Sequence, residues 1–202
     1  MDTENRFAEP IKKSSLKLVG GLHAATLSAS RNDFLVSGLL HPGEVSALWG
    51  LSGIGKTFVT LHLAMSIAFG RGWFGHEVKA GAVLYVNCEG QHGFGKRIWG
   101  LLDHWGETAD QAKKPFDMTY SSPSLLTSSG QEAFQEALDA YFAEYSAHPK
   151  LIVIDTLARS FGGGDENNAS HMSSYLNFCN EIAKEFECHV LLNHHGGKDA
   201  SK

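Results

Sequence analysis

The sequence is poor in the features that mark secreted, disulfide-bonded and membrane proteins. Its three cysteines (Cys88, Cys179 and Cys188) form no CxxC pair. An odd number of widely spaced cysteines favours small core residues in a reducing compartment over a disulfide framework. No apolar run approaches the roughly 20 residues of a membrane-spanning helix. The start, MDTENRFAEP, is polar and acidic, unlike a signal or transit peptide. We therefore expect a cytoplasmic protein without a membrane partner.

Positive charge is also scarce, because 17 lysines and arginines stand against 22 acidic residues, for a net charge of −5. Contact with nucleic acid would therefore need a local patch or a channel shared between subunits. A chain of 202 residues with 43% hydrophobic composition has room for one domain with a substantial core. We expect a partly disordered lead-in segment over residues 1–36 and a core over 37–202.

Hydrophobic periodicity predicts strands that alternate with helices. Continuous apolar runs indicate buried strands, and stripes spaced by three and four residues indicate helices. The strands are expected near residues 34–40, 45–49, 82–90, 116–120, 150–156 and 188–195, and the helices near 56–69, 98–105, 134–145 and 172–186. The first helix is expected to stop at Gly70 and to bury a face made by Phe58, Leu61, Ala64, Ile67 and Ala68. Such alternation favours an α/β fold with a mostly parallel sheet.

The segment GLSGIGKT at 50–57 fits the pattern G-x-x-x-x-G-K-[ST] of a phosphate-binding loop. Glycines let backbone N–H groups turn inward around a phosphate, and the following helix directs its N-terminus at the anion. A chance glycine turn is the alternative, but the strand before and the helix after it favour nucleotide binding. The predicted nucleotide-binding residues are Gly50, Leu51, Ser52, Gly53, Ile54, Gly55, Lys56 and Thr57.

Two carboxylates complete the predicted site. Asp155 ends the apolar run LIVID, where it would hold Mg²⁺ together with the hydroxyl of Thr57. Many P-loop ATPases place a glutamate directly after this aspartate, but here Thr156 takes that position. Glu89, at the end of an earlier strand, is the candidate general base, since parallel strands bring their carboxyl ends to one edge. The alternatives are an aspartate that only ends a strand and a solvated loop glutamate.

Four stretches together resemble the ATPase core of the RepA-like hexameric replicative helicases of plasmids and phages, which are RecA-like P-loop ATPases. They are GLLHPGEVSALWGLSGIGKT, GRGWFGHEVKAGAVLYVNCEG, LIVIDTLARSFGGGDENNASHM and VLLNHHGGKDASK, and the likeness runs from about residue 35 to 202. The resemblance implies a RecA-like P-loop fold with strand order 3-2-4-5-1. It also implies ATP and Mg²⁺ as cofactors, a homo-hexameric ring in the full-length form, and single-stranded DNA as partner.

The resemblance suggests further site residues. His194 or His195 would sense the γ-phosphate, and because adjacent strand residues face opposite ways, only one of the pair can do so. We assign this role to His194, with two ordinary strand-end histidines as the alternative. Arg97 resembles a basic residue on the γ-phosphate side, although a solvated helix arginine explains it equally well. The glycine-rich, acidic segment 160–170 resembles a channel-facing loop, with a plain flexible connection as the alternative.

One departure from the family pattern concerns the C-terminal end. The resemblance continues into further strands, an arginine finger and a basic channel loop, which we do not find before Lys202. We therefore expect a core that appears truncated at its C-terminal strands, with the phosphate-loop strand near an exposed sheet edge. We also expect the isolated chain to be a weak ATPase, because a finger supplied in trans is worth about 10³–10⁵ in rate.

Several functions remain open at the level of sequence. The main hypothesis is a helicase ATPase that couples hydrolysis to translocation on single-stranded DNA. A recombination or repair ATPase of the RecA or RadA type would form filaments instead of rings. A P-loop kinase would need an arginine-bearing lid, which we do not find. A regulatory or loader protein would bind ATP as a switch without efficient hydrolysis.

Overall fold

The computed structural model describes residues 20–22, 33–89, 91–108, 114–119 and 121–196. The chain divides into two units, Met1–Asn32 and Asp33–Lys202. Most of the predicted lead-in segment 1–36 lies outside the described residues. Leu35 and Val36, which that segment was expected to include, are buried in the core of the second unit.

The second unit is built on a five-stranded sheet in the order β1-β5-β4-β2-β3. The strands are β1 (Val45–Gly50), β2 (Val83–Asn87), β3 (Phe116–Thr119), β4 (Leu151–Asp155) and β5 (His189–His195). All four neighbouring pairs are parallel. The α/β class, the parallel sheet and the strand order 3-2-4-5-1 are therefore confirmed.

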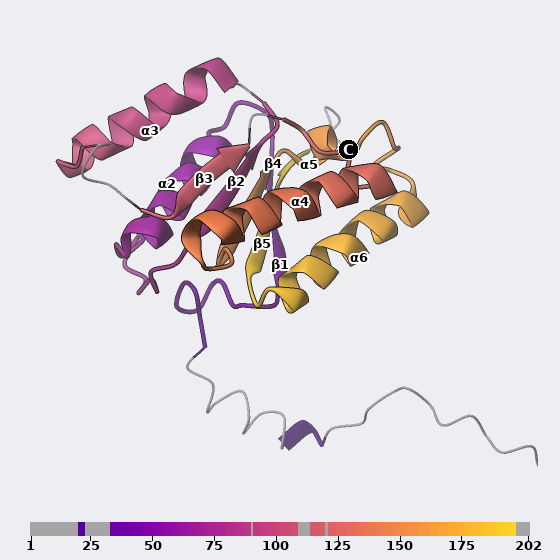
Figure 1. Ribbon diagram of the computed structural model, residues 1–202, viewed down its shortest axis with the longest axis horizontal. Helices are drawn as coiled ribbons and strands as arrows, with labels where there is room; N and C mark the ends of the chain where they lie inside the picture. The colour runs from indigo at the N-terminus through magenta and orange to yellow at the C-terminus, as the bar shows by residue number, and fades with distance from the viewer. Residues whose placement is uncertain (1–19, 23–32, 90, 109–113, 120, 197–202) are drawn as a thin grey trace, which may run out of the picture. The chain divides into compact units, whose positions relative to one another are not determined.

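Helices cover both faces of this sheet, as Figure 1 shows. The helices α4 (Ser128–Tyr145) and α6 (Ala169–Glu185) pack on one face, and α2 (Lys56–Phe69) and α3 (Gln91–Trp105) on the other. The short α5 (Leu157–Ser160) follows β4 directly. Among the described residues, no helix is long and apolar enough to cross a membrane.

The central strands are buried on both faces, which explains their unbroken apolar sequences. Every residue of β2 (VLYVN) and β4 (LIVID) is buried. Their side chains alternate between the two cores: Leu84 and Val86 join the core under α4 and α6, whereas Val83 and Tyr85 join the core under α2. This alternation later decides which polar side chains face the phosphate loop.

The edge of the sheet at β1 differs from two expectations. The predicted strand at 34–40 is instead a tight turn with isolated bridges from Val36 to Leu40 and to Val78. Gly38, at φ 73°, reverses the chain there, so an extended run cannot form. The predicted strand at 45–49 is present as β1, but it is only partly buried. Among the described strands, β1 pairs with β5 alone, so its outer edge lacks a covering neighbour.

Helix α2 ends where its sequence predicts, but Phe58 near its start is more exposed than expected. Gly70 caps the helix in the left-handed conformation (φ 67°) and donates its N–H to the carbonyl of Ile67. Leu61 and Ile67 lie in the core as predicted. Phe58 was expected on the same face but is 59% exposed, and its ring contacts the guanidinium of Arg97 instead of the core.

Two glycine-to-alanine substitutions should change stability in opposite directions. Gly70→Ala forces an alanine into positive φ and places its Cβ 3.1 Å from Cβ of Ala80. We expect it to lower the free energy of unfolding by about 1 kcal/mol. Gly100→Ala lies inside α3 with no atom within 4 Å of the new Cβ, so it should raise that energy by about 0.5–1 kcal/mol. Urea denaturation measures both, and equal shifts would contradict the assignment.

Candidate nucleotide site

The loop between β1 and α2 has the conformation that a phosphate cradle requires. Gly53 (φ 81°) and Gly55 (φ 95°) adopt left-handed backbone angles that other residues rarely take. Gly55 is also the N-cap of α2, and no side chain caps this helix end. The first N–H groups of the helix therefore remain available to an anion, whose charge the helix dipole favours.

Lys56 is held inside this loop by three acceptors. The side chain is only 7% exposed. Its Nζ donates to the carbonyl oxygens of Gly50 and Leu51 at 2.8 Å each, and it lies 3.0 Å from Nδ1 of His195. An ammonium group has three donors and no acceptor, so Nδ1 of His195 must accept. To bind a triphosphate, Lys56 would exchange some of these three acceptors for phosphate oxygens.

Asp155 stands in a transverse row of buried polar side chains at the carboxyl ends of three strands. In the strand register it pairs with Asn87 of β2 and with Asn193 of β5. The three side chains are at most 2% exposed. By strand alternation they lie on the same face of the sheet as Tyr85, which packs on the α2 side. Oδ2 of Asp155 accepts a hydrogen bond of 2.7 Å from the hydroxyl of Tyr85.

The donor set around Asp155 fits a hydrated Mg²⁺ ion. Nδ2 of Asn87 and Oδ1 of Asn193 are buried without a hydrogen-bond partner among the described residues. Such orphaned polar atoms are rare inside proteins and are frequent where a ligand or ion completes a site. Mg²⁺ keeps several waters and takes only one or two protein ligands, which here would be Thr57 and Asp155. Among the described residues there is no group of three or more His, Cys, Asp or Glu residues that could hold a metal ion.

Glu89 lies at the same edge of the sheet and contacts side chains from the segment after β4 and from the end of β5. Its Oε1 accepts hydrogen bonds from Oγ1 of Thr156 at 3.1 Å and from Nε of Arg159 at 3.3 Å. Its Oε2 lies 3.9 Å from Nε2 of His195. Because His195 also contacts Lys56, a single imidazole connects the candidate base with the phosphate-loop lysine. The carboxyl ends of β1, β2, β4 and β5 therefore converge as the strand order requires.

The structure selects His195, not His194, as the histidine that faces the phosphate loop. Strand alternation places Asn193 and His195 on the α2 side, where Nδ2 of Asn193 donates to Thr60. His194 takes the opposite face, and its Nδ1 is buried without a hydrogen-bond partner among the described residues. The γ-phosphate sensor role that the sequence assigned to His194 stays a prediction, but of the two histidines it is His195 that lies on the side of the phosphate loop. A tertiary contact was needed to see this, because both residues end the same strand.

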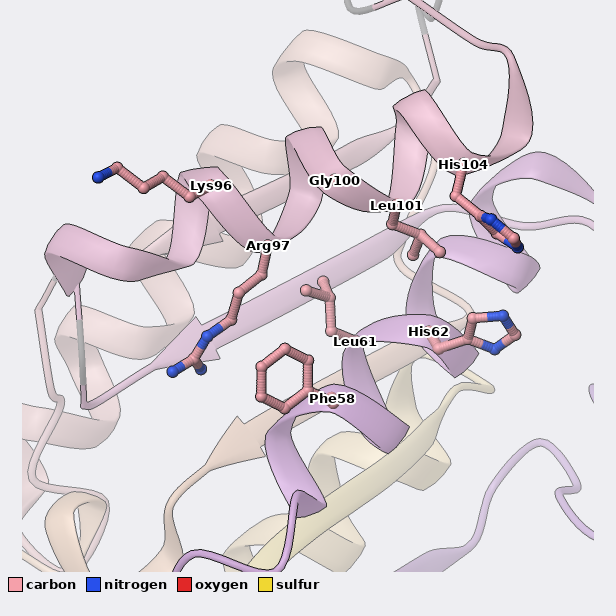
Figure 2. A pocket seen from close by; sticks show the side chains of 8 residues that line it. All are labelled: Phe58, Leu61, His62, Lys96, Arg97, Gly100, Leu101 and His104. Carbon is pink, nitrogen blue, oxygen red and sulfur yellow. The ribbon is translucent and has the colours of Figure 1, made fainter.

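Arg97 lies in a groove of about 490 Å³ between α2 and α3 (Figure 2). Its guanidinium carbon is 4.8 Å from the centre of the Phe58 ring, a cation–π contact. Phe58 directly follows Thr57, so this contact places Arg97 beside the first turn of α2. Among the described residues, the side-chain partners of Glu89 are Thr156, Arg159 and His195, and Arg97 is not one of them. Arg159, which the sequence reasoning did not select for the site, is the arginine that pairs with it.

The acidic segment after α5 folds back on itself through short-range hydrogen bonds. Oδ1 of Asp165 accepts from the N–H of Asn167, and Asn168 caps α6 by accepting from two backbone N–H groups. Nδ1 of His171 accepts from the backbone N–H of Asp165. These contacts describe a local loop, and its proximity to a DNA channel stays a prediction.

A parallel α/β sheet that joins a phosphate loop to a strand-end aspartate defines the class of P-loop nucleotide-binding proteins. Comparison with known families agrees with this class. The model of an AAA domain family matches residues 18–201, and the chain belongs to that family, whose domains are of the P-loop ATPase type. No curated protein matches the chain.

Removing the loop lysine should weaken nucleotide binding itself. Lys56→Ala deletes the ammonium that would bind the β- and γ-phosphates, a charged interaction worth about 1.5–3 kcal/mol. We expect the Kd for ATP to rise by about 10–100-fold in a calorimetric or fluorescence titration. Lys96→Ala, at an exposed lysine of α3, is the matched control and should bind as wild type does. Equal affinities for Lys56→Ala and wild type would exclude the cradle.

Proposed function

We propose that this chain is the ATP-hydrolysing core of a RepA-like DNA helicase, which couples hydrolysis to translocation on single-stranded DNA. The observation that carries the proposal is the position of Glu89. Glu89 lies just after β2, two strands away from β5, yet its carboxylate lies beside the histidine that contacts the phosphate-loop lysine. The AAA domain family supports an ATPase in general, and the helicase activity is our inference from the site.

The residues divide the work of hydrolysis among four strand ends. The loop N–H groups and Lys56 bind the phosphates, and Thr57 and Asp155 would hold Mg²⁺. When bound, that ion neutralises charge on the β- and γ-phosphates. Glu89 orients a water and takes its proton as the water oxygen bonds to the γ-phosphorus. The bond from that phosphorus to the bridging oxygen breaks, and its electrons leave with ADP.

The pairing of Glu89 favours a motor over a kinase. Its partners are Thr156, the N-cap of α5, and Arg159 within α5, and this helix ends at Ser160, where the glycine-rich segment 160–170 begins. A partner bound to that segment would therefore act on the candidate base through a connection of only a few residues. In a kinase, the acid would instead serve an acceptor hydroxyl in a pocket closed by a lid, and a connection of this kind would have no use.

Substitution of the candidate base should separate binding from hydrolysis. Glu89→Gln keeps the size of the side chain but removes its basicity, so we expect ATP affinity to stay within about twofold and turnover to fall by about 10²–10⁴-fold. In the full-length form, single-stranded DNA should stimulate wild-type turnover and leave Glu89→Gln unstimulated. Glu107→Gln, which loses only an ion pair with Arg71, is the matched control and should hydrolyse normally. Equal turnover by Glu89→Gln and wild type would reject the base, and a lack of DNA stimulation in wild type would reject the helicase.

The assembly should be a closed ring if the helicase proposal is right. The outer edge of β1 pairs with no other described strand, and Trp49 on that strand is 61% exposed, so subunit contacts are expected to protect surface of this kind. Native mass measurement of the full-length form with ATP and single-stranded DNA should give one discrete hexamer, and turnover per chain should rise with protein concentration. A broad series of masses would indicate a recombinase-type filament, and a persistent monomer would contradict both assemblies.

A further inference from the structure

A line of four buried polar side chains runs beneath the phosphate loop and ends on Asp155. Nδ2 of Asn193 donates to Oγ1 of Thr60 at 3.0 Å, and Oγ1 of Thr60 lies 3.0 Å from the hydroxyl of Tyr85. That hydroxyl donates to Oδ2 of Asp155 at 2.7 Å. All four residues are at most 2% exposed. Of these four residues, only Asp155 was predicted from the sequence as a site residue.

The protons in this line can be assigned from the chemistry of the groups. An amide Nδ2 can only donate, so Thr60 accepts from Asn193. An ionised Asp155 can only accept, so the single phenolic proton of Tyr85 is used there. The bonds from Asn193 to Thr60 and from Tyr85 to Asp155 therefore have fixed directions. The single hydroxyl proton of Thr60 has three acceptors within reach, which are the hydroxyl of Tyr85 and the carbonyl oxygens of Lys56 and Thr57.

The line also joins the two candidate metal anchors. Oγ1 of Thr60 lies 3.1 Å from the carbonyl oxygen of Lys56 and 3.3 Å from that of Thr57, one helical turn earlier in α2. Tyr85 therefore connects the turn that carries Thr57 with the carboxylate of Asp155 on β4. Without such a connection, a carboxylate at a strand end could rotate about its side-chain torsions. The hydrogen bond from Tyr85 to Oδ2 restricts this rotation and would leave Oδ1 for the cation.

We propose that Tyr85 is a positioning residue that orients Asp155 for a divalent cation bound with the nucleotide, with Thr60 and Asn193 holding its hydroxyl in place. The inference rests on the proposed function, in which Asp155 is the cation anchor. Mg²⁺ tolerates little departure from octahedral geometry, so its affinity depends on how firmly its protein ligands are oriented. Residues that hydrogen-bond a ligand from outside are worth about 10–100-fold in metal affinity.

The hydroxyl can be removed without disturbing the aromatic packing. The ring of Tyr85 lies 4.7 Å from the ring of Phe94 and 6.4 Å from that of Phe116, measured between centroids, and phenylalanine preserves both contacts. Tyr85→Phe should weaken binding of Mn²⁺ in the presence of ATP by about 10–100-fold in an electron paramagnetic resonance titration. The affinity for ATP in EDTA should stay unchanged, because no phosphate contact is lost.

Tyr175→Phe is the matched control for a merely structural loss. The hydroxyl of Tyr175 is also buried and lies 2.7 Å from Oγ of Ser160, but it belongs to the core on the opposite face of the sheet. The Tyr175→Phe variant should lose stability in denaturation as Tyr85→Phe does, yet it should bind Mn²⁺ as wild type does. Equal weakening of Mn²⁺ binding in the two variants would overturn the proposal. If Tyr85→Phe does not fold, Thr60→Val interrupts the same line without touching the ring, and the same difference is expected.

Asp155→Asn separates a failure of this inference from a failure of the proposed function. We expect it to weaken Mn²⁺ binding at least as much as Tyr85→Phe does. If Asp155→Asn weakens Mn²⁺ binding but Tyr85→Phe and Thr60→Val do not, the positioning role is wrong and the metal anchor stands. If Asp155→Asn binds Mn²⁺ as wild type does, the anchor itself is wrong, and the positioning role falls with it.

Discussion

Parallel pairing of β5 between β1 and β4 is the constraint on which the candidate site depends. Because all neighbouring strands run in one direction, their carboxyl ends lie at a single edge of the sheet. Lys56 follows the edge strand and Asp155 ends β4, and β5 between them supplies Asn193 and His195. An antiparallel β5 would direct its histidines to the far edge and leave the loop lysine without its third acceptor.

The electrostatics of the site follow from this convergence. A buried ammonium is unfavourable unless all of its donors are satisfied, and Lys56 meets this condition with two carbonyls and one imidazole. Acceptance at Nδ1 leaves the other ring nitrogen of His195 facing Glu89 at 3.9 Å. A phosphate that draws Lys56 away therefore removes the partner of His195 next to the candidate base. This gives a short physical route from nucleotide binding to the acid that would act in hydrolysis.

The two faces of the sheet serve different purposes. The face under α4 and α6 is an apolar core that includes Leu138, Ile154 and Tyr175. The face under α2 is apolar in its middle but becomes polar near the phosphate loop, where Asn87, Asp155 and Asn193 lie in register. Each unpartnered buried polar atom costs about 1–3 kcal/mol. A fold retains such atoms where a ligand completes their hydrogen bonds, and here they flank the proposed cation anchor.

Local pattern was sufficient for the elements and for the chemistry of the loop. Spacing alone predicted α2 with its stop at Gly70, and apolar runs predicted β2 and β4, because each signal lies within one short segment. The strand order came from the family resemblance, since periodicity does not say which strands are neighbours. Only the tertiary structure decided between His194 and His195, paired Glu89 with Arg159, and placed Tyr85 against Asp155. These contacts join residues up to 139 positions apart, as Lys56 and His195 are, and they depend on strand phase and register. A sequence states which groups are present, but the packed sheet determines which of them meet.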